Sequence, residues 1–192
     1  MSAPTDTLFD MDAAALIGVS SSAWLGTVNL SDIIYTPPGI AKEIVEHFKP
    51  TGRILDPCRG GGAFADEMPG CEWCELREGK NFFEWREPVD WIVSNPPYSI
   101  LDEWLIHSYT VATNIVYLLP LPKLFNSAQR LRMITERGGI KELLVTGGGA
   151  RHGFPWGYAC GAFHFVTGYK GPCKMTVSAS ANADLSHAAN KT

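Results

Sequence analysis

The chain has 192 residues, which favours a single domain, and its 45% hydrophobic and 19% charged residues are typical of a globular protein. No apolar run is long enough to span a membrane, and Asp residues stand near the N-terminus where a signal peptide needs a basic segment. The five cysteines are odd in number and irregularly spaced, which argues against a disulfide framework. We therefore expect a cytoplasmic protein with no membrane partner.

The net charge of −4 is unevenly distributed along the chain. Residues 1–100 carry 7 Lys and Arg against 15 Asp and Glu, whereas residues 101–192 carry 9 against 5. The overall charge argues against strong non-specific binding to nucleic acid. A basic face built from the C-terminal half remains compatible with this distribution.

The first part of the chain predicts an irregular arm followed by a regular domain. Residues 1–30 show no clear period and are expected to form this arm, with one short helix near Ala13–Ile17. A helix follows, because Pro38 suits its first turn and the side chains of Ile40, Ile44, Val45 and Phe48 share one face. "RILDP" then predicts a buried strand, and "RGGGAFADEM" predicts a glycine turn that opens into a short helix.

The rest of the chain alternates between apolar strand runs and helical periods. The expected strands are 71–77, 90–95, 114–121, 140–149 and 158–169. The expected helices are 100–112 and 127–139, the second with glycine as its C-terminal signal, and 81–85 is a brief further element. We place the domain at residues 31–175 and expect a disordered tail over 176–192.

Strands that alternate with helices predict an α/β fold with a doubly wound, mostly parallel sheet. The last two strands, joined by the loop 147–157, add a closing antiparallel pair. Ligands of such folds bind beyond the carboxyl ends of the strands. Asp56 and Asn95 both end strands, so we expect them on the same rim although 39 positions separate them in sequence.

The segment "ILDPCRGGGAF" places an acid, Asp56, before Gly60, Gly61 and Gly62, which allows backbone N–H groups to approach a ligand closely. It lacks the Lys of a phosphate-binding loop and the spacing of a dinucleotide fingerprint. A tight turn without a ligand is the alternative reading. Glu75 ends the next strand, where an acid often accepts hydrogen bonds from a ribose diol; alone, it would be a surface Glu.

The segment "SNPPY" offers acceptors for an amino group. Asn95 supplies an amide oxygen, and Pro96 supplies a carbonyl without an N–H of its own. Pro97 restricts the backbone, and Tyr98 supplies an aromatic face for a flat base. A rigid turn with a core tyrosine is the alternative interpretation.

Four segments in this order, "YTPP", "LDPCRGGGAF", "CEL" and "SNPPY", resemble the S-adenosylmethionine-dependent adenine-N6 DNA methyltransferases over about residues 34–169. The compact size is similar to that of small phage-like adenine methylases, so a bacterial or phage-infected cell is the implied setting. The resemblance implies a Rossmann-like methyltransferase fold with S-adenosylmethionine as cofactor. The cofactor-binding residues that it implies are Thr36, Pro37, Asp56, Gly60, Gly62, Glu75 and Asn81, and the catalytic residues are Asn95, Pro96, Pro97 and Tyr98.

The resemblance further implies a mechanism. Asn95 and Pro96 would accept both hydrogens of the N6 amino group of a flipped-out adenine, while Tyr98 stacks on the base. No metal is expected. DNA is the expected partner, and its specificity would come from the N-terminal arm, segments 122–135 and 147–157, a homodimer or another subunit. The alternatives are adenine-N6 methylation of RNA, methylation of a protein glutamine side chain, and a non-catalytic methyltransferase-like subunit.

Three weaker signals favour structural readings or remain open. Cys71 and Cys74 could form half a zinc site with Cys160 and Cys173, but a second close pair is missing. The loop 147–157 could reach the substrate with its charged and aromatic residues, which are Arg151, His152, Phe154 and Trp156. A solvated helix face is the more common role of basic residues such as Arg130, Arg132, Arg137 and Lys141.

Overall fold

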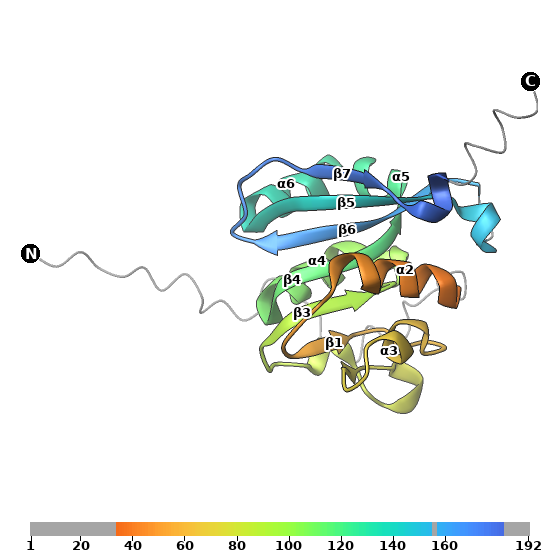
Figure 1. Cartoon of the computed structure of the whole chain (residues 1–192). Coiled ribbons are helices and arrows are strands. Elements are labelled where there is room, and N and C mark those ends of the chain that lie inside the picture. Colours follow the sequence, from red (N-terminus) through yellow and green to blue (C-terminus); the bar gives the residue numbers. More distant parts are fainter. Residues whose placement is uncertain (1–33, 155–156, 183–192) are drawn as a thin grey trace, which may run out of the picture.

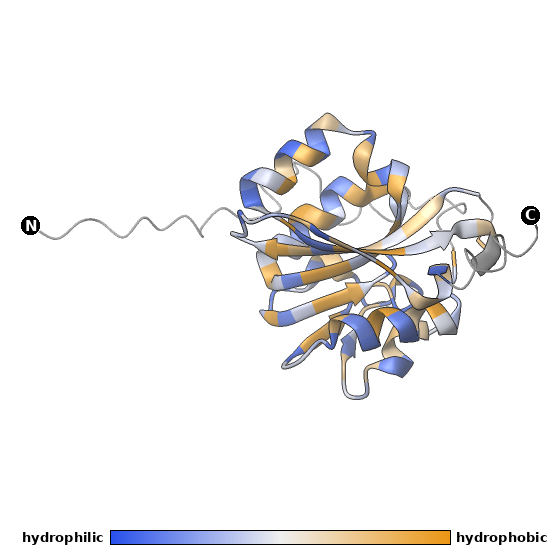
Figure 2. Cartoon of the chain, turned by 45° about the horizontal axis from the view of Figure 1, so that its top comes forward, coloured by the Kyte–Doolittle hydropathy of each residue, from blue (hydrophilic) through white to orange (hydrophobic). Residues whose placement is uncertain are grey.

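The computed structural model describes residues 34–154 and 157–182. These residues form a seven-stranded sheet in the order β2-β1-β3-β4-β6-β5-β7, with helices on both faces (Figures 1 and 2). The strands are β1 (Ile54–Asp56), β2 (Glu72–Trp73), β3 (Val89–Ser94), β4 (Ala112–Pro120), β5 (Gly138–Gly148), β6 (Ala159–Thr167) and β7 (Lys174–Val177). The helices are α2 (Pro38–Phe48), α3 (Ala63–Glu67), α4 (Leu101–Val111), α5 (Leu121–Phe125) and α6 (Ala128–Arg137), with 3-10 turns η3 (Leu76–Glu78), η4 (Phe82–Glu84), η5 (Tyr98–Ile100) and η6 (Gly149–His152).

The pairing of the strands confirms the predicted fold class. β2, β1, β3 and β4 run parallel, β6 is antiparallel to both β4 and β5, and β7 is parallel to β5. As a result, β1, β2, β3, β4, β5 and β7 all present their carboxyl ends at one edge of the sheet. This edge is called the rim below.

The central strands are buried on both faces, which explains their continuous apolar sequence. Ile92 and Ile115 pack among the helices α4, α5 and α6, whereas Val93 and Val116 pack among α2 and α3 on the opposite face. The register pairs Ser94 of β3 with Tyr117 of β4, so both strands approach the rim together. The sheet therefore holds the carboxyl ends of β1 and β3 on a rigid base.

Three sequence expectations differ from the structure. β2 covers Glu72–Trp73 rather than 71–77, because Glu75 already caps the turn η3 with its side chain. The tail expected from residue 176 contributes Thr176 and Val177 to β7, and a helical turn follows over 179–182. The helix expected over 127–139 ends at Arg137; Gly138 is its C-cap, as the glycine signal predicted, but it has an extended φ of 179° and already begins β5.

The reason for glycine at position 138 is close packing. A Cβ atom there would lie 2.1 Å from the carbonyl oxygen of Val166 in β6.

The predicted arm and its short helix at Ala13–Ile17 lie outside the described residues. Within the described part of the chain, no helix has the length and apolar character that crossing a bilayer requires.

Candidate active site

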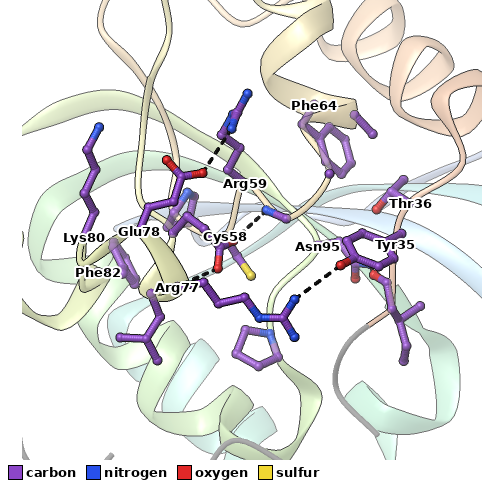
Figure 3. Close-up of a pocket in the computed structure, with 18 of the residues that line it drawn as sticks. Tyr35, Thr36, Cys58, Arg59, Phe64, Arg77, Glu78, Lys80, Phe82 and Asn95 are labelled. Carbon is purple, nitrogen blue, oxygen red and sulfur yellow. Dashed lines mark hydrogen bonds and ion pairs between the residues drawn. The ribbon is translucent and has the colours of Figure 1, made fainter. Parts of the chain in front are cut away.

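A cavity of about 700 Å³ opens at the carboxyl ends of β1, β2 and β3 (Figure 3). Its walls come from four segments, within residues 34–38, 57–67, 75–83 and 95–104. This volume lies within the ~300–1,000 Å³ that is typical of pockets for small molecules and cofactors. Segments far apart in the sequence therefore meet at the place where the fold class predicts a ligand.

The cavity brings together six of the predicted site residues: Thr36, Gly60, Glu75, Asn81, Asn95 and Pro97. The other five predicted residues are not part of its lining; these are Pro37, Asp56, Gly62, Pro96 and Tyr98. Sequence reasoning missed several lining residues, among them Tyr35, Arg77, Phe83 and Trp104. Tyr35 adjoins the Thr-Pro segment that was singled out, but nothing in the sequence indicated its orientation.

The glycine turn forms one wall of the cavity. Gly60 and Gly62 adopt positive φ angles of 52° and 90°, a backbone conformation that favours glycine. Gly61 is constrained by space instead, because a Cβ atom there would lie 3.3 Å from the ring of Tyr35. The turn is tightened by a hydrogen bond of 2.8 Å from the Gly62 amide to the Arg59 carbonyl oxygen.

Asp56 supports the turn from behind the cavity. Its Oδ1 accepts hydrogen bonds from Ser94 Oγ at 2.7 Å and from the Cys58 amide at 3.2 Å. Its Oδ2 has no hydrogen-bond partner among the described residues. Burial raises the pKa of Asp56 to about 6, against the lowering effect of the hydrogen bonds from Ser94 and Cys58. Asp56 thus links the end of β1 to β3, directly beside Asn95.

Glu75 links the glycine turn to the turn η3. Its Oε2 accepts the Gly60 amide at 2.9 Å, and its Oε1 accepts the Arg77 amide at 3.2 Å. Each carboxylate oxygen has a second lone-pair direction, and the side chain lines the cavity. Glu75 can therefore accept further hydrogen bonds from hydroxyl groups of a ligand.

Aromatic residues form the far end of the cavity. Phe82 and Phe83 lie next to Trp104 of α4, with ring centroids 4.9 Å and 5.3 Å from the Trp104 ring. Asn81 precedes them and uses its Oδ1 to accept the Phe83 amide at 3.1 Å. This end of the cavity has the apolar walls that a flat heterocycle requires.

Asn95 faces the cavity from the end of β3 with both ends of its amide engaged. Its Nδ2 donates to the Ile34 carbonyl oxygen at 3.1 Å, and its Oδ1 accepts the Tyr98 hydroxyl at 2.6 Å. Tyr98 is only 7% exposed and packs in the core with α4. In this structure Tyr98 holds Asn95, and its ring is not presented to the cavity.

The fold of this chain is similar to that of several solved structures. A protein assigned as a class I S-adenosylmethionine-dependent methyltransferase from Listeria monocytogenes superposes with a TM-score of 0.56 at 9% identity, covering 91% of this chain and 76% of that one. A protein assigned as the modification subunit of a type I restriction enzyme from Vibrio vulnificus gives 0.54 at 16% identity. The EcoKI M protein, also from a type I restriction enzyme, gives 0.52 at 12%.

These likenesses establish a shared fold at low sequence identity. The matches to both type I subunits cover 72% of this chain and 45% of theirs, so the chain spans less than half of their length. No protein-family model matches the sequence, and no curated protein matches it. In this chain, the cavity lies at the rim of the sheet of that shared fold.

The remaining sequence signals concern the loop 147–157 and the cysteines. Phe154 packs in the core beneath α2, so the substrate role considered for it is wrong. The side chains of Arg151, His152 and Trp156 lie outside the described part of the structure. Cys160 lies in β6, and no three His, Cys, Asp or Glu residues of the described chain are grouped so that they could hold a metal.

Proposed function

We propose that this chain is an S-adenosylmethionine-dependent methyltransferase that acts on the N6 amino group of adenine in DNA. One observation carries the proposal: a single cavity joins Asn95 and Pro97 to the glycine turn and Glu75. A methyl donor and its acceptor must meet within bonding distance, so their binding groups must share one space. The fold shared with methyltransferase structures supports the same reading.

The residues present fit the cofactor. Gly60 and Gly61 offer a surface without side chains for its methionine part, and Glu75 offers acceptors for the ribose hydroxyls. The aromatic end around Phe82, Phe83 and Trp104 suits its adenine ring. When bound, the cofactor supplies an electrophilic methyl group on a sulfonium.

Asn95 is the proposed catalytic acceptor. Its Nδ2 donates to Ile34, which fixes the amide orientation and leaves Oδ1 with one lone-pair direction beyond the Tyr98 bond. That oxygen would accept an N–H of the substrate amino group, together with the carbonyl of Pro96. Both acceptors would stabilise the positive charge that develops on nitrogen as the methyl group transfers. No strong base is required, because the methylated nitrogen loses its proton readily.

The test is methyl transfer from labelled S-adenosylmethionine to DNA, RNA and protein extract in parallel. We expect label on adenine N6 in DNA, and we expect Asn95→Ala to reduce the rate by about 10²–10³-fold with cofactor affinity retained. Asn182→Ala serves as the matched control, because Asn182 is exposed, follows β7 and is not part of the cavity lining.

Other outcomes would replace the proposal with a defined alternative. Label only in RNA would indicate RNA adenine methylation, and label only in protein would indicate a glutamine side chain as the acceptor. Cofactor binding without transfer to any substrate would indicate a non-catalytic subunit. Normal transfer by Asn95→Ala would contradict the assigned mechanism.

A further inference from the structure

The side chain of Tyr35 lies on the glycine turn. The Tyr35 ring lies 3.3 Å from the place of a Cβ on Gly61 and 3.7 Å from that of a Cβ on Gly60, so the ring packs directly against both residues. Tyr35 lines the cavity, and Figure 3 shows its hydroxyl directed towards Arg77. The proposed function assigns this same surface of the turn to the methionine part of the cofactor.

Arg77 holds the ring from the opposite wall. Its Nη1 donates to the Tyr35 hydroxyl at 3.4 Å, a contact that joins the segment before α2 to the turn η3 across the cavity (Figure 3). Both residues are exposed, and Tyr35 retains 58% of its accessible surface. The contact is therefore weak, and breaking it exposes little additional apolar surface.

The backbone on either side of Tyr35 is anchored, so its side chain is the part that can move. The Ile34 carbonyl accepts the Asn95 amide at 3.1 Å. The Pro37 carbonyl accepts the amides of Ile40 and Ala41 at the start of α2. A rotation of the Tyr35 side chain clears the glycine turn without disturbing either anchor.

We propose that Tyr35, held by Arg77, competes with the cofactor for the surface of the glycine turn, so that the ring must rotate away before the cofactor binds. The inference rests on the proposed function. The ring then acts as an internal competitor that sets the cofactor affinity and the association rate. Under this scheme the measured dissociation constant is the intrinsic constant divided by the fraction of molecules with the ring rotated away.

The test measures binding of S-adenosylhomocysteine to the full chain by calorimetry, and its association rate by stopped-flow tryptophan fluorescence. If the open form makes up about a tenth of the molecules, Tyr35→Ala should bind up to about tenfold more tightly, through faster association. Tyr35→Phe and Arg77→Gln each remove the same hydrogen bond and should each tighten binding about threefold. The double variant that combines Tyr35→Phe with Arg77→Gln should bind S-adenosylhomocysteine no more tightly than either single variant.

Tyr158→Ala is the matched control, because Tyr158 is 61% exposed and lies outside the cavity lining. Its binding should equal that of the wild type. Unchanged or weaker binding by Tyr35→Ala, with wild-type binding intact, would overturn this inference and leave the proposed function standing. Failure of both the wild type and Tyr35→Ala to bind would overturn both.

Discussion

At the scale of single residues, the central feature of the site is the contact between Asn95 and Tyr98. The hydroxyl of Tyr98 carries one proton, and its 2.6 Å distance to Asn95 Oδ1 is much shorter than its 3.4 Å distance to the Leu118 carbonyl oxygen. We therefore assign the Tyr98 hydroxyl as a hydrogen-bond donor to Asn95 Oδ1. Together with the bond to Ile34, this contact fixes the plane of the amide. Tyr98 acts here as a positioning residue.

Tyr98→Phe tests this role. The change keeps the buried ring and removes the hydroxyl, so we expect a folded protein with a less ordered Asn95 amide. The rate of methyl transfer should fall about tenfold, because misplaced acceptors stabilise the transition state less. Cofactor affinity should not change. The measurement is kcat together with the dissociation constant of S-adenosylhomocysteine.

Tyr109→Phe provides the control for Tyr98→Phe. Tyr109 is also buried, but its hydroxyl has no hydrogen-bond partner among the described residues. Removing the Tyr109 hydroxyl should leave kcat unchanged, and the free energy of unfolding should stay equal or increase. A full-rate Tyr98→Phe enzyme would show that the hydroxyl does not position Asn95.

Asp56 leads to a pH prediction. Its pKa of about 6 in the folded protein, raised by burial from the ordinary value of 3.8, means that the folded protein holds the proton more tightly than the unfolded chain. Its contribution to stability is complete below pH 3.8 and is lost as the pH rises through about 6. Asp56→Asn removes this titration. As the pH rises from 4 to 7, the free energy of unfolding of the variant should therefore increase by up to about 3 kcal/mol relative to that of the wild type.

Urea denaturation of both proteins at pH 4, 5.5 and 7 measures the Asp56 effect. Using the difference between variant and wild type cancels the titration of other groups, such as His107 and His164. Burial lowers the pKa of each of these histidines to about 4, which favours stability at higher pH instead. A stability difference that does not vary with pH would exclude Asp56 as its source.

At the scale of elements, the helices and strands that could be predicted from the sequence are those whose own apolar residues mark the faces they bury. β3 and β4 contain the apolar runs 91–93 and 115–119, and α2 has an apolar face with Pro38 in its first turn. β7 was missed because its four residues form a strand only through their partners. It pairs with β5, and Lys174 and Thr176 both bind Glu142 there.

The same distinction applies to the site. The positions of Asn95, Gly60 and Glu75 on one rim could be predicted, because strand order alone sends their segments there. The burial of Tyr98 and the placement of Asp56 behind the cavity could not. These depend on which way each side chain packs once α4 and β1 are in place.

Glu142 of β5 joins this strand to β7 and to α2. Its carboxylate accepts hydrogen bonds from Lys174 and Thr176 of β7 and contacts His47 of α2 at 2.8 Å. Partial burial raises its pKa, but the hydrogen bonds from Lys174, His47 and Thr176 outweigh this effect and lower the pKa to about 2. Glu142 therefore stabilises the fold above pH 4.5, and this contribution is lost as the pH falls through about 2.

Glu142→Gln should cost about 1–2 kcal/mol of unfolding free energy at pH 7, and the cost should shrink as the pH falls below 4.5. Urea denaturation at pH 7, 5 and 3 measures it. Glu46→Gln is the control, since Glu46 is exposed and its nearest cation, Lys42, lies 3.9 Å away. That change should have almost no effect. An equal loss in both variants would contradict a special role for Glu142.

At the scale of the whole molecule, the two halves of the chain supply different surfaces. The cavity is lined by residues of the acidic half, 1–100, with Trp104 as the one lining residue from the basic half. The basic half supplies β4 to β7, and α5 starts at the rim directly after Pro120. Lys123 on α5 and Arg132 on α6 are exposed, as is Phe125 between them. Contacts with a polyanionic substrate are therefore expected on α5 and α6.

Lys123→Gln and Arg132→Gln test this division, on the basis of the proposed DNA substrate. The slope of log K against log salt concentration is negative, and each lost phosphate contact should reduce its magnitude by about 0.9 for duplex DNA. Lys42→Gln on α2 and Lys49→Gln at its C-cap remove the same charge from exposed positions and should leave the slope unchanged. Fluorescence anisotropy with a labelled duplex, at several salt concentrations, measures the slopes. An equal decrease in all four variants would mean that net charge, and not the α5–α6 surface, governs binding.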